Sequence, residues 1–264
     1  MFLSKLILNH RNRDVRRDLA DCHNLHRSVM SAFPHLNSPS ARDELAVLHR
    51  LEVNLRSGAL VVFVQSAAEP DWNQLPSGYL LEAEDNPACK PINGSYSALR
   101  DGQQLAFRLR ANPTKKVAAF DAEGNKKKNG TRAELHGEQK QTEWLVRKSA
   151  QHGFQLLRLR ISQDQTAARQ MFEMTEPSDL PTVAPANVRA NPAIKTCGWR
   201  GEANRRAEKD RLTFGAVIFE GLLEITDADK FKQALANGIG SGKAYGFGLL
   251  SVAPAGARMS ASAG

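Results

Sequence analysis

The sequence contains little cysteine and no long hydrophobic run. Its three cysteines, Cys22, Cys89 and Cys197, are odd in number and far apart, which argues against a disulfide framework or a zinc knuckle and favours a reducing cytosol. The apolar runs have the length of strands, which is too short to span a membrane. The N-terminal stretch MFLSKLILNHRNR also lacks the apolar length and the cleavage pattern of a signal peptide. These absences predict a soluble, cytoplasmic protein.

Acidic and aromatic side chains are also in short supply. The 264 residues include 28 Asp and Glu against 36 Lys and Arg, so the formal net charge is +8, and the isoelectric point is near 9.6. A chain this basic is typical of proteins that bind a polyanion. Three Trp and three Tyr are too few for extensive stacking of nucleobases, so we expect shape and charge to dominate recognition.

The order of the apolar segments predicts an α+β fold made of two similar units. The first unit combines a helix over residues 14–33 with expected strands at 2–8, 45–55, 59–65, 79–83 and 104–110. The second combines helices over 135–150 and 227–236 with expected strands at 115–120, 154–161, 193–200, 212–225 and 247–252. This order indicates tandem ferredoxin-like (RRM-like) βαββαβ domains, with residues 1–113 in the N-terminal domain and 114–264 in the C-terminal one. Prolines punctuate residues 163–192, where we expect an irregular insertion.

A glycine-rich segment, GIGSGKAYGFG, spans residues 238–248. Glycine allows positive φ and close approach of the backbone to a phosphate. Walker and Rossmann loops follow a strand and open a helix, whereas this segment follows an expected helix and opens an expected strand. A helix C-cap with a tight loop is the alternative interpretation, and Lys243 within the segment favours an anion contact.

Two histidines, His23 and His26, lie three residues apart on the first expected helix and are therefore neighbours on its surface. His26 falls within the apolar stripe of that helix, so a core histidine is a serious alternative to a functional one. If Asp21 caps a separate, later helix, the apolar stripe of a single helix no longer shows whether His26 faces the core. Without a third ligand, this pair does not predict a metal site.

Basic residues gather in several runs, any one of which is also compatible with a solvated face. The run from Arg200 to Arg211 differs because its middle residues are expected at the tip of a long hairpin. A basic β-ribbon can enter a nucleic-acid groove. The major groove of A-form RNA is narrow, so such entry favours a short stem with an accessible end.

Several of these segments together resemble one known family. They are FLSKL at 2–6, Asp18-Leu19 followed by LHR at 25–27, FRLRANP at 107–113, FEG at 219–221, GIGSGK at 238–243 and GFGLLS at 246–251. In this order they resemble the CasE family, the CRISPR-RNA-processing endoribonucleases of type I-E systems, from residue 2 to about Pro254. The FRLRANP and glycine-rich segments are the most specific, and residues 163–192 match nothing in the family.

The resemblance implies a protein that binds the stem-loop of a CRISPR repeat and cuts precursor RNA at the 3′ base of the stem, with no metal or cofactor. Attack by the neighbouring 2′-hydroxyl would leave a 5′-hydroxyl and a 2′,3′-cyclic phosphate. The processed crRNA then stays bound, and the protein joins the other subunits of the Cascade complex. A subunit that binds RNA without cutting it is the alternative.

The resemblance also implies site residues. The catalytic histidine of the family falls on His26, while the tyrosine that the family often has three residues earlier is His23 here. Lys243 in the glycine-rich segment completes the expected catalytic set. The expected RNA-binding residues are Arg27, Arg108, Arg110, Lys115, Lys116, Arg200, Arg205, Arg206, Lys209, Arg211, Gly240, Ser241 and Gly242.

The chemistry limits what the two histidines can do. Internal attack by a 2′-hydroxyl needs a base, an acid and cationic stabilisation of the phosphate. The entering and leaving oxygens lie on opposite sides of phosphorus, whereas imidazoles on adjacent helical turns approach from one side. We therefore expect one essential proton transfer by His26 and an assisting role for His23. Lys243 or a nearby arginine is expected to stabilise charge, by roughly 2–4 kcal/mol.

Overall fold

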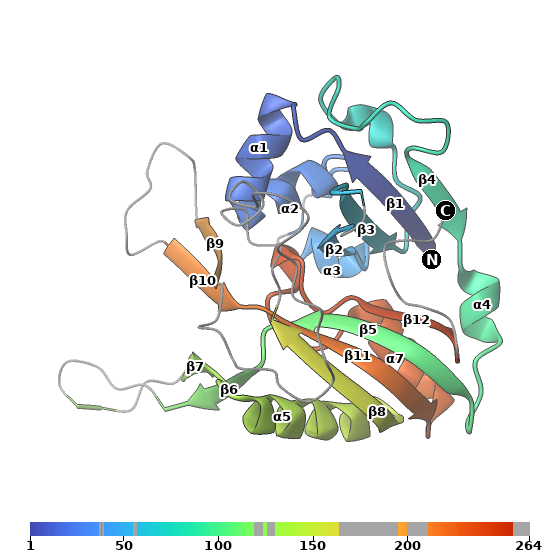
Figure 1. Cartoon of the computed structure of the whole chain (residues 1–264), viewed down its shortest axis with the longest axis vertical. Coiled ribbons are helices and arrows are strands. Elements are labelled where there is room, and N and C mark those ends of the chain that lie inside the picture. Colours follow the sequence, from blue (N-terminus) through green and yellow to red (C-terminus); the bar gives the residue numbers. More distant parts are fainter. Residues whose placement is uncertain are drawn as a thin grey trace.

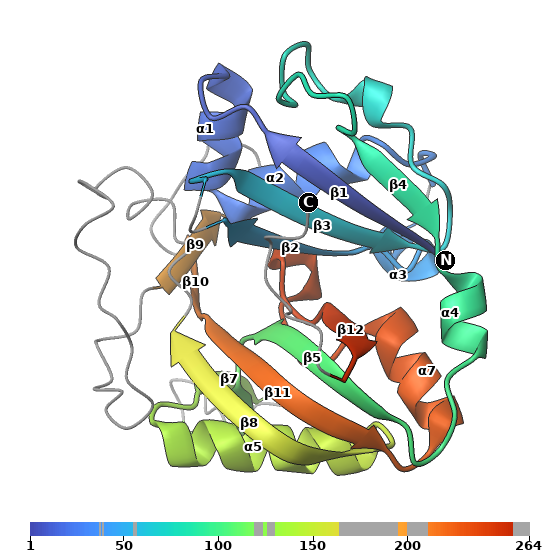
Figure 2. The same cartoon turned by 45° about the vertical axis from the view of Figure 1, so that its right-hand side comes forward.

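The computed structural model describes residues 1–36, 38, 40–54, 57–118, 124–125, 130–163, 195–199 and 211–255. The proline-rich stretch at 164–192 and the expected hairpin tip at 200–210 lie outside the described residues. Two four-stranded antiparallel sheets, one above the other in Figure 2, dominate the described part. No helix among the described residues is long and apolar enough to cross a membrane.

The first sheet has the strand order β2-β3-β1-β4. Its strands are β1 (Phe2–Leu8), β2 (Leu48–Val53), β3 (Leu60–Ser66) and β4 (Ala88–Pro91). β1 lies between β3 and β4, and its register with β3 runs from Phe2 opposite Ser66 to Leu8 opposite Leu60. The strands predicted at 2–8, 45–55 and 59–65 are thus confirmed. The strand predicted at 79–83 is wrong. These residues form no strand, and Leu80 pairs with Leu8 of β1 as an isolated bridge.

Two helices, not one, follow β1. They are α1 (Arg13–Ala20) and α2 (Cys22–Met30), and they pack their apolar side chains on the first sheet (Figure 1). Asp21 interrupts the single helix predicted over 14–33 because its backbone is extended, with φ −144°, and its carboxylate accepts a hydrogen bond from the His23 amide. His23 and His26 therefore lie on a helix whose direction is independent of α1.

The second sheet has the strand order β12-β5-β11-β8. Its strands are β5 (Gln104–Ala111), β8 (Phe154–Gln163), β11 (Val217–Ile225) and β12 (Leu250–Pro254). The helices α5 (Glu138–Gln151) and α7 (Ala228–Asn237) share its apolar core, where Phe107 lies with Trp144 and Phe219. Each set of four strands has the order of a ferredoxin-like unit, so the predicted fold class is confirmed.

The position of β5 differs from the sequence analysis. We placed this strand at the end of the first unit, but β5 pairs with β11 and β12 in the second sheet. Its apolar face, including Leu105 and Leu109, belongs to the second core. The division between the sheets therefore falls between Pro91 and Gln104, not at residue 113. The last strand also begins later than predicted, at Leu250.

Short elements complete the described fold. The strands β6 (Thr114–Val117) and β7 (Thr131–Glu134) form one small hairpin, and β9 (Lys195–Trp199) and β10 (Arg211–Gly215) form another. The latter confirms the predicted pairing, and it lies beside α2 (Figure 1). The remaining elements are α3 (Ala41–Glu44), η1 (Trp72–Gln74), α4 (Asn93–Ser97) and η5 (Lys243–Tyr245).

Buried polar contacts join the two sheets. The Glu52 carboxylate on β2 accepts from Arg50 Nε at 2.5 Å and from Arg108 Nη1 on β5 at 2.8 Å. Arg50 also donates to the carbonyl of Leu249 at 3.0 Å, and Gln65 donates to that of Leu235 at 2.6 Å. These contacts fix β2 and β3 relative to β5, α7 and the end of the glycine-rich segment in the second unit.

Candidate active site

The helix α2 carries His23 and His26 with part of each side chain exposed. Leu25 and Val29 turn into the first core and so fix the rotation of the helix. The Nδ1 atoms of both histidines are buried and have no hydrogen-bond partner among the described residues. Both imidazoles therefore lie at the edge of the core with hydrogen-bonding capacity that the described part of the chain leaves unused.

A third imidazole, that of His49, lies next to His26. The rings are nearly parallel, with 17° between their planes and 6.0 Å between their centroids. His49 is only 1% exposed, and neither of its nitrogens has a hydrogen-bond partner in the described ranges. Sequence reasoning missed His49; the one available signal was a histidine within a strand that is otherwise largely buried.

The glycine-rich segment folds into a turn that faces these histidines. Gly242 and Gly246, with φ 77° and 82°, flank η5 and reverse the chain on either side of it. The carbonyl of Gly246 accepts from Arg110 Nη1 at 3.0 Å. A Cβ at Gly246 would come within 3.1 Å of that nitrogen and 3.3 Å of His49 Nε2. The turn therefore needs glycine here, and η5 packs against α2 and β2.

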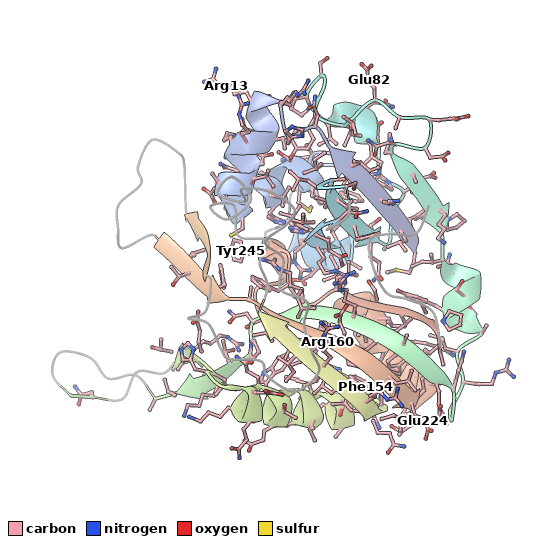
Figure 3. The ribbon with its side chains drawn as sticks, viewed as in Figure 1. Arg13, Glu82, Phe154, Arg160, Glu224 and Tyr245 are labelled. Atoms are coloured by element: carbon pink, nitrogen blue, oxygen red, sulfur yellow. The ribbon has the colours of Figure 1, made fainter. Side chains whose placement is uncertain are left out.

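Tyr245 on this turn brings an aromatic ring to the site. It lies between α2 and the β9–β10 hairpin (Figure 3), with its centroid 6.2 Å from that of His23 and 4.9 Å from that of Phe214. Sequence reasoning also missed Tyr245, since nothing local distinguishes it. The other two tyrosines, Tyr79 and Tyr96, donate hydrogen bonds in the interior.

The electrostatics of the site keep the imidazoles of His26 and His49 uncharged at neutral pH. Burial, followed by the nearby His23 and Arg42, lowers the pKa of His26 to about 4. Burial also lowers the pKa of His49 well below its usual value, and His26, Arg110 and Arg42 act in the same direction. Burial lowers the pKa of Lys243 too, with smaller contributions from Arg42 and Lys148. Cationic groups thus crowd this site, and Arg42 contributes to all three shifts.

Such an arrangement suits proton transfer at an anionic substrate. A neutral imidazole accepts a proton at pH 7, and cationic neighbours stabilise negative charge that develops nearby. The described residues contain no group of three or more His, Cys, Asp or Glu side chains able to hold a metal ion. The groups that the described part of this site offers for such chemistry are imidazole and cationic side chains.

The expected RNA-binding residues occupy different environments. Arg27, Lys115 and Lys116 are exposed, on α2 and β6. Ser241 bridges to Asn112 at the start of the glycine-rich turn, between Gly240 and Gly242. Arg211 opens β10, and its side chain lies outside the description. The remaining members of the set are also outside the described residues: Arg200, Arg205, Arg206 and Lys209.

Two of the expected RNA-binding arginines hold the protein together. Arg108 forms ion pairs with Glu52 and, at 2.9 Å, with Glu220. Arg110 is 4% exposed, and its guanidinium lies 4.3 Å above the centroid of the Phe247 ring while it donates to Gly246. Arg108 therefore stabilises the contact between the sheets, and Arg110 stabilises the glycine-rich turn.

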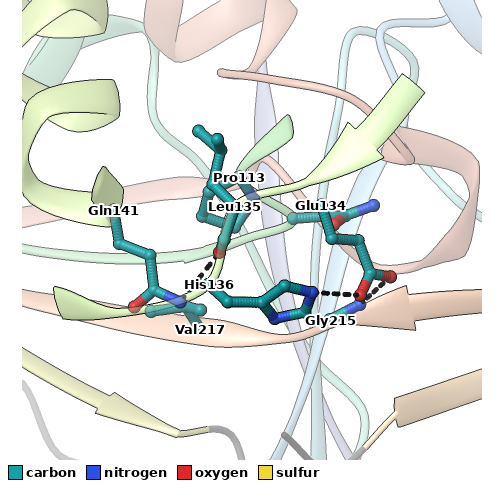
Figure 4. Close-up of a pocket in the computed structure, with 8 residues that line it drawn as sticks. Pro113, Glu134, Leu135, His136, Gln141, Gly215 and Val217 are labelled. Carbon is teal, nitrogen blue, oxygen red and sulfur yellow. Dashed lines mark hydrogen bonds and ion pairs between the residues drawn. The ribbon is translucent and has the colours of Figure 1, made fainter. Parts of the chain in front are cut away.

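A small pocket is lined by residues of β7 and β11 and by Asn112 and Pro113, which follow β5 (Figure 4). Its volume of ≈ 10 Å³ is about that of one water molecule. The Glu134 carboxylate in its wall accepts from the Gly215 amide at 2.8 Å and lies 4.0 Å from His136. This pocket is too small for a substrate, and its carboxylate already binds a backbone amide. The candidate site is therefore the cluster around His26.

Comparison with known proteins places the chain among CRISPR-associated proteins. A family model described as "CRISPR associated protein" matches residues 1–254. The "CRISPR-associated endoribonuclease Cse3" of Thermus thermophilus is 35% identical over 260 residues, which cover 96% of this chain and 100% of that protein. The "CRISPR system Cascade subunit CasE" of Escherichia coli is 29% identical over 259 residues, with 96% and 100% covered.

Solved structures give the same result. A structure of the CRISPR endoribonuclease Cse3 bound to a 19-nucleotide RNA matches with a TM-score of 0.68 and 32% identity, covering 96% of this chain and 100% of that one. Thermus thermophilus Cse3 bound to an RNA that represents a pre-cleavage complex matches with a TM-score of 0.64 and 32% identity, covering 96% and 98%.

Proposed function

The chain belongs to the family of CRISPR-associated proteins whose model matches residues 1–254, and on this basis we propose that it is an endoribonuclease that processes CRISPR RNA. Its substrate is the repeat stem-loop of the precursor RNA. The 35% identity to a relative named as a CRISPR-associated endoribonuclease supports this function. The structural observation that supports it most directly is the uncharged imidazole of His26 among cationic side chains.

Cleavage proceeds by attack of the RNA's own 2′-hydroxyl at the 3′ base of the stem. A base takes the hydroxyl proton, a bond forms between the 2′ oxygen and the neighbouring phosphorus, and the bond from phosphorus to the next 5′ oxygen breaks. The departing 5′ oxygen takes up a proton from solvent water. One product ends in a 2′,3′-cyclic phosphate and the other begins with a 5′-hydroxyl, and the step balances without a metal or a cofactor.

His26 is the base in this mechanism, because a pKa of about 4 leaves its imidazole free to accept a proton at pH 7. Lys243 stabilises the charge on the phosphate, a type of contact whose loss slows other enzymes about 100- to 1000-fold. His23 approaches from the same side as His26. It therefore orients the substrate, and it does not protonate the leaving oxygen.

Binding of the stem relies on phosphate contacts. Arg27, Lys115 and Lys116 are exposed and available to phosphates, and Ser241 with its flanking glycines offers backbone amides to a phosphate. The basic run from Arg200 to Arg211 contributes the remaining contacts in this proposal. Arg108 and Arg110 act as supports, since each is already engaged within the protein.

The processed RNA stays bound, and the protein joins the Cascade complex in the cytoplasm. The similarity to the Escherichia coli protein named as a Cascade subunit supports this part of the proposal. We further propose that the chain forms two domains, whose boundary falls in the segment between β4 and β5. The site then lies where α2 of the first domain meets the glycine-rich turn of the second.

A cleavage assay with a repeat stem-loop RNA in EDTA tests this function. The wild-type protein is expected to cut once, at the 3′ base of the stem, and His26→Ala is expected to lose at least about 100-fold in rate. The products should carry a 5′-hydroxyl and a cyclic phosphate. If the RNA binds tightly but neither protein cuts it, the chain is a non-cleaving RNA-binding subunit. If His26→Ala cuts as fast as wild type, the assignment of His26 is wrong.

A further inference from the structure

Arg42 on α3 is close enough to the histidine cluster for its charge to act on both His26 and His49, although nothing in its local sequence singles it out. Its guanidinium folds over the turn between α3 and β2, where Nη1 donates to the carbonyl of Val47 at 3.1 Å and the Arg42 carbonyl accepts from the Val47 amide at 2.9 Å. His49 follows Val47 by two residues, on β2, and its ring is stacked on that of His26. The hydrogen bonds of this turn therefore hold the Arg42 side chain against the backbone that leads directly into the strand of His49.

The surroundings of Arg42 leave its charge only partly neutralised. Its side chain is 15% exposed, and it forms an ion pair with Asp43, whose own side chain is 69% exposed. An ion pair with so exposed a carboxylate is weak and exchanges readily with other anions. The charge of Arg42 is also close enough to lower the pKa of His26, of His49 and of Lys243.

Crowded positive charge that burial has partly desolvated is costly unless an anion compensates for it. The fully buried His49, with two nitrogens that have no partner among the described residues, is a second mark of a site built for a ligand. We propose that Arg42 contacts the scissile phosphate of the RNA and stabilises the negative charge that accumulates on it during cleavage. This inference rests on the proposed function and adds a substrate-binding arginine to it.

The guanidinium supplies what the imidazoles and Lys243 do not. It presents several N–H donors in one plane and so binds two phosphate oxygens at once, whereas an ammonium acts as a point charge. With Lys243 on the glycine-rich turn and Arg42 on α3, cations from both proposed domains reach the phosphate. His26 remains the group that accepts the proton.

The test compares three variants: Arg42→Gln, Asp43→Asn and, as a matched control, Arg17→Gln. Arg17 forms an ion pair with the aspartate that follows it, as Arg42 does, but it lies on α1 with Asp14 and Asp18. Single-turnover cleavage at saturating RNA is measured with affinity for an uncuttable RNA that has a 2′-deoxyribose at the cleavage site. Arg42→Gln is expected to cut about 100-fold more slowly and to lose only a few-fold in affinity. Asp43→Asn should cut at least as fast as wild type, since it frees the guanidinium.

Two results overturn the proposal. One is a cleavage rate for Arg42→Gln within threefold of that for Arg17→Gln. The other is an equal loss in Asp43→Asn and Arg42→Gln, which would mean that the ion pair only maintains the turn. Arg42→Lys is a second variant that keeps the charge, and melting temperatures show which variants are folded.

An NMR titration of the His26 ring separates this proposal from the proposed function. Removing the positive charge in Arg42→Gln is expected to raise the pKa of His26, whether or not the protein cuts RNA. If the wild-type protein does not cut RNA but Arg42→Gln raises the pKa of His26, the proposed function fails, while the proximity of Arg42 to His26 is confirmed. If wild type cuts and Arg42→Gln leaves both the titration and the rate unchanged, only the role of Arg42 fails.

Discussion

The imidazole ring of His49 lies 6.0 Å from that of His26 and nearly parallel to it, although one belongs to β2 and the other to α2. Alternation along β2 explains the contact, because His49 points to the same side as Val47 and Leu51, which pack in the first core with α2. Burial lowers the pKa of both rings, and a proton on His26 would lower that of His49 further. The pair is therefore uncharged at neutral pH.

We expect the stability of the protein to fall in mild acid because of this pair. A histidine has a pKa of about 6.5 in an unfolded chain, while that of folded His26 is about 4. The unfolded state then binds more protons, so stability is complete above about pH 6.5 and is lost as the pH falls towards 4. The loss from His26 alone is about 3 kcal/mol. Urea unfolding between pH 7 and pH 4 measures it.

The variant His49→Leu isolates the second ring. Leucine fills a similar volume and removes two buried nitrogens without partners, so the free energy of unfolding at pH 7 should stay equal or rise. The dependence on pH should become shallower than in wild type, since one depressed histidine is gone. A dependence as steep as that of wild type would show that His49 does not titrate with folding.

The pH dependence of cleavage follows from the same low pKa. As the base, His26 must be unprotonated, which it is at all pH values well above 4. The value of kcat/KM, which reports on the free protein, is therefore expected to stay level from pH 8 to about pH 5 and to fall below that. A rate that instead falls as the pH rises through 6 to 8 would assign His26 the role of acid.

Substitution of Gly246 should damage both folding and activity. Any side chain there is strained at φ 82°, and its Cβ also presses on Arg110 and His49. Gly102→Ala is the matched control, because Gly102 has a φ of 75° but nothing within 4 Å of its would-be Cβ. We expect each variant to lose about 1–2 kcal/mol from backbone strain. Only Gly246→Ala should also lose cleavage, because Lys243 moves with the turn, and equal rates for the two variants would contradict this.

The fold was largely predictable from local patterns, but the assignment of strands to sheets was not. The apolar run at 59–65 and the alternation at 104–110 mark strands because side chains alternate between the faces of a sheet. The same alternation does not say which partners a strand takes. β5 follows the first unit in the chain, yet its partners β11 and β12 lie more than a hundred residues further on. Long-range pairing of this kind decided the boundary between the units.

Some residues of the candidate site could likewise be predicted from the sequence, and others could not. The resemblance to a known family pointed to His26, His23 and Lys243, and the packing of η5 on α2 gathers them in one region. Arg42, His49 and Tyr245 reach that region only through tertiary contacts from a short helix, a buried strand and a turn. Their local sequence does not show that they reach this site: the one signal at His49 is its place in a largely buried strand. Conversely, Arg110 looks like a surface arginine in an alternating strand, but its neighbours bury it.

The contact between the sheets should be vulnerable at Glu52. Its buried carboxylate binds Arg50 and Arg108, so Glu52→Gln leaves two arginines without a counterion at that position and is expected to cost about 3–5 kcal/mol in the free energy of unfolding. Glu220→Gln is the matched control, because Glu220 binds the same Arg108 but is 25% exposed, and it should cost less than about 1 kcal/mol. Urea unfolding of both variants at pH 7 measures the difference. Since this contact also holds β2, against which the η5 turn packs, Glu52→Gln protein that remains folded should cut RNA more slowly than Glu220→Gln. Equal stabilities for the two variants would show that the sheets are held by their apolar contacts instead.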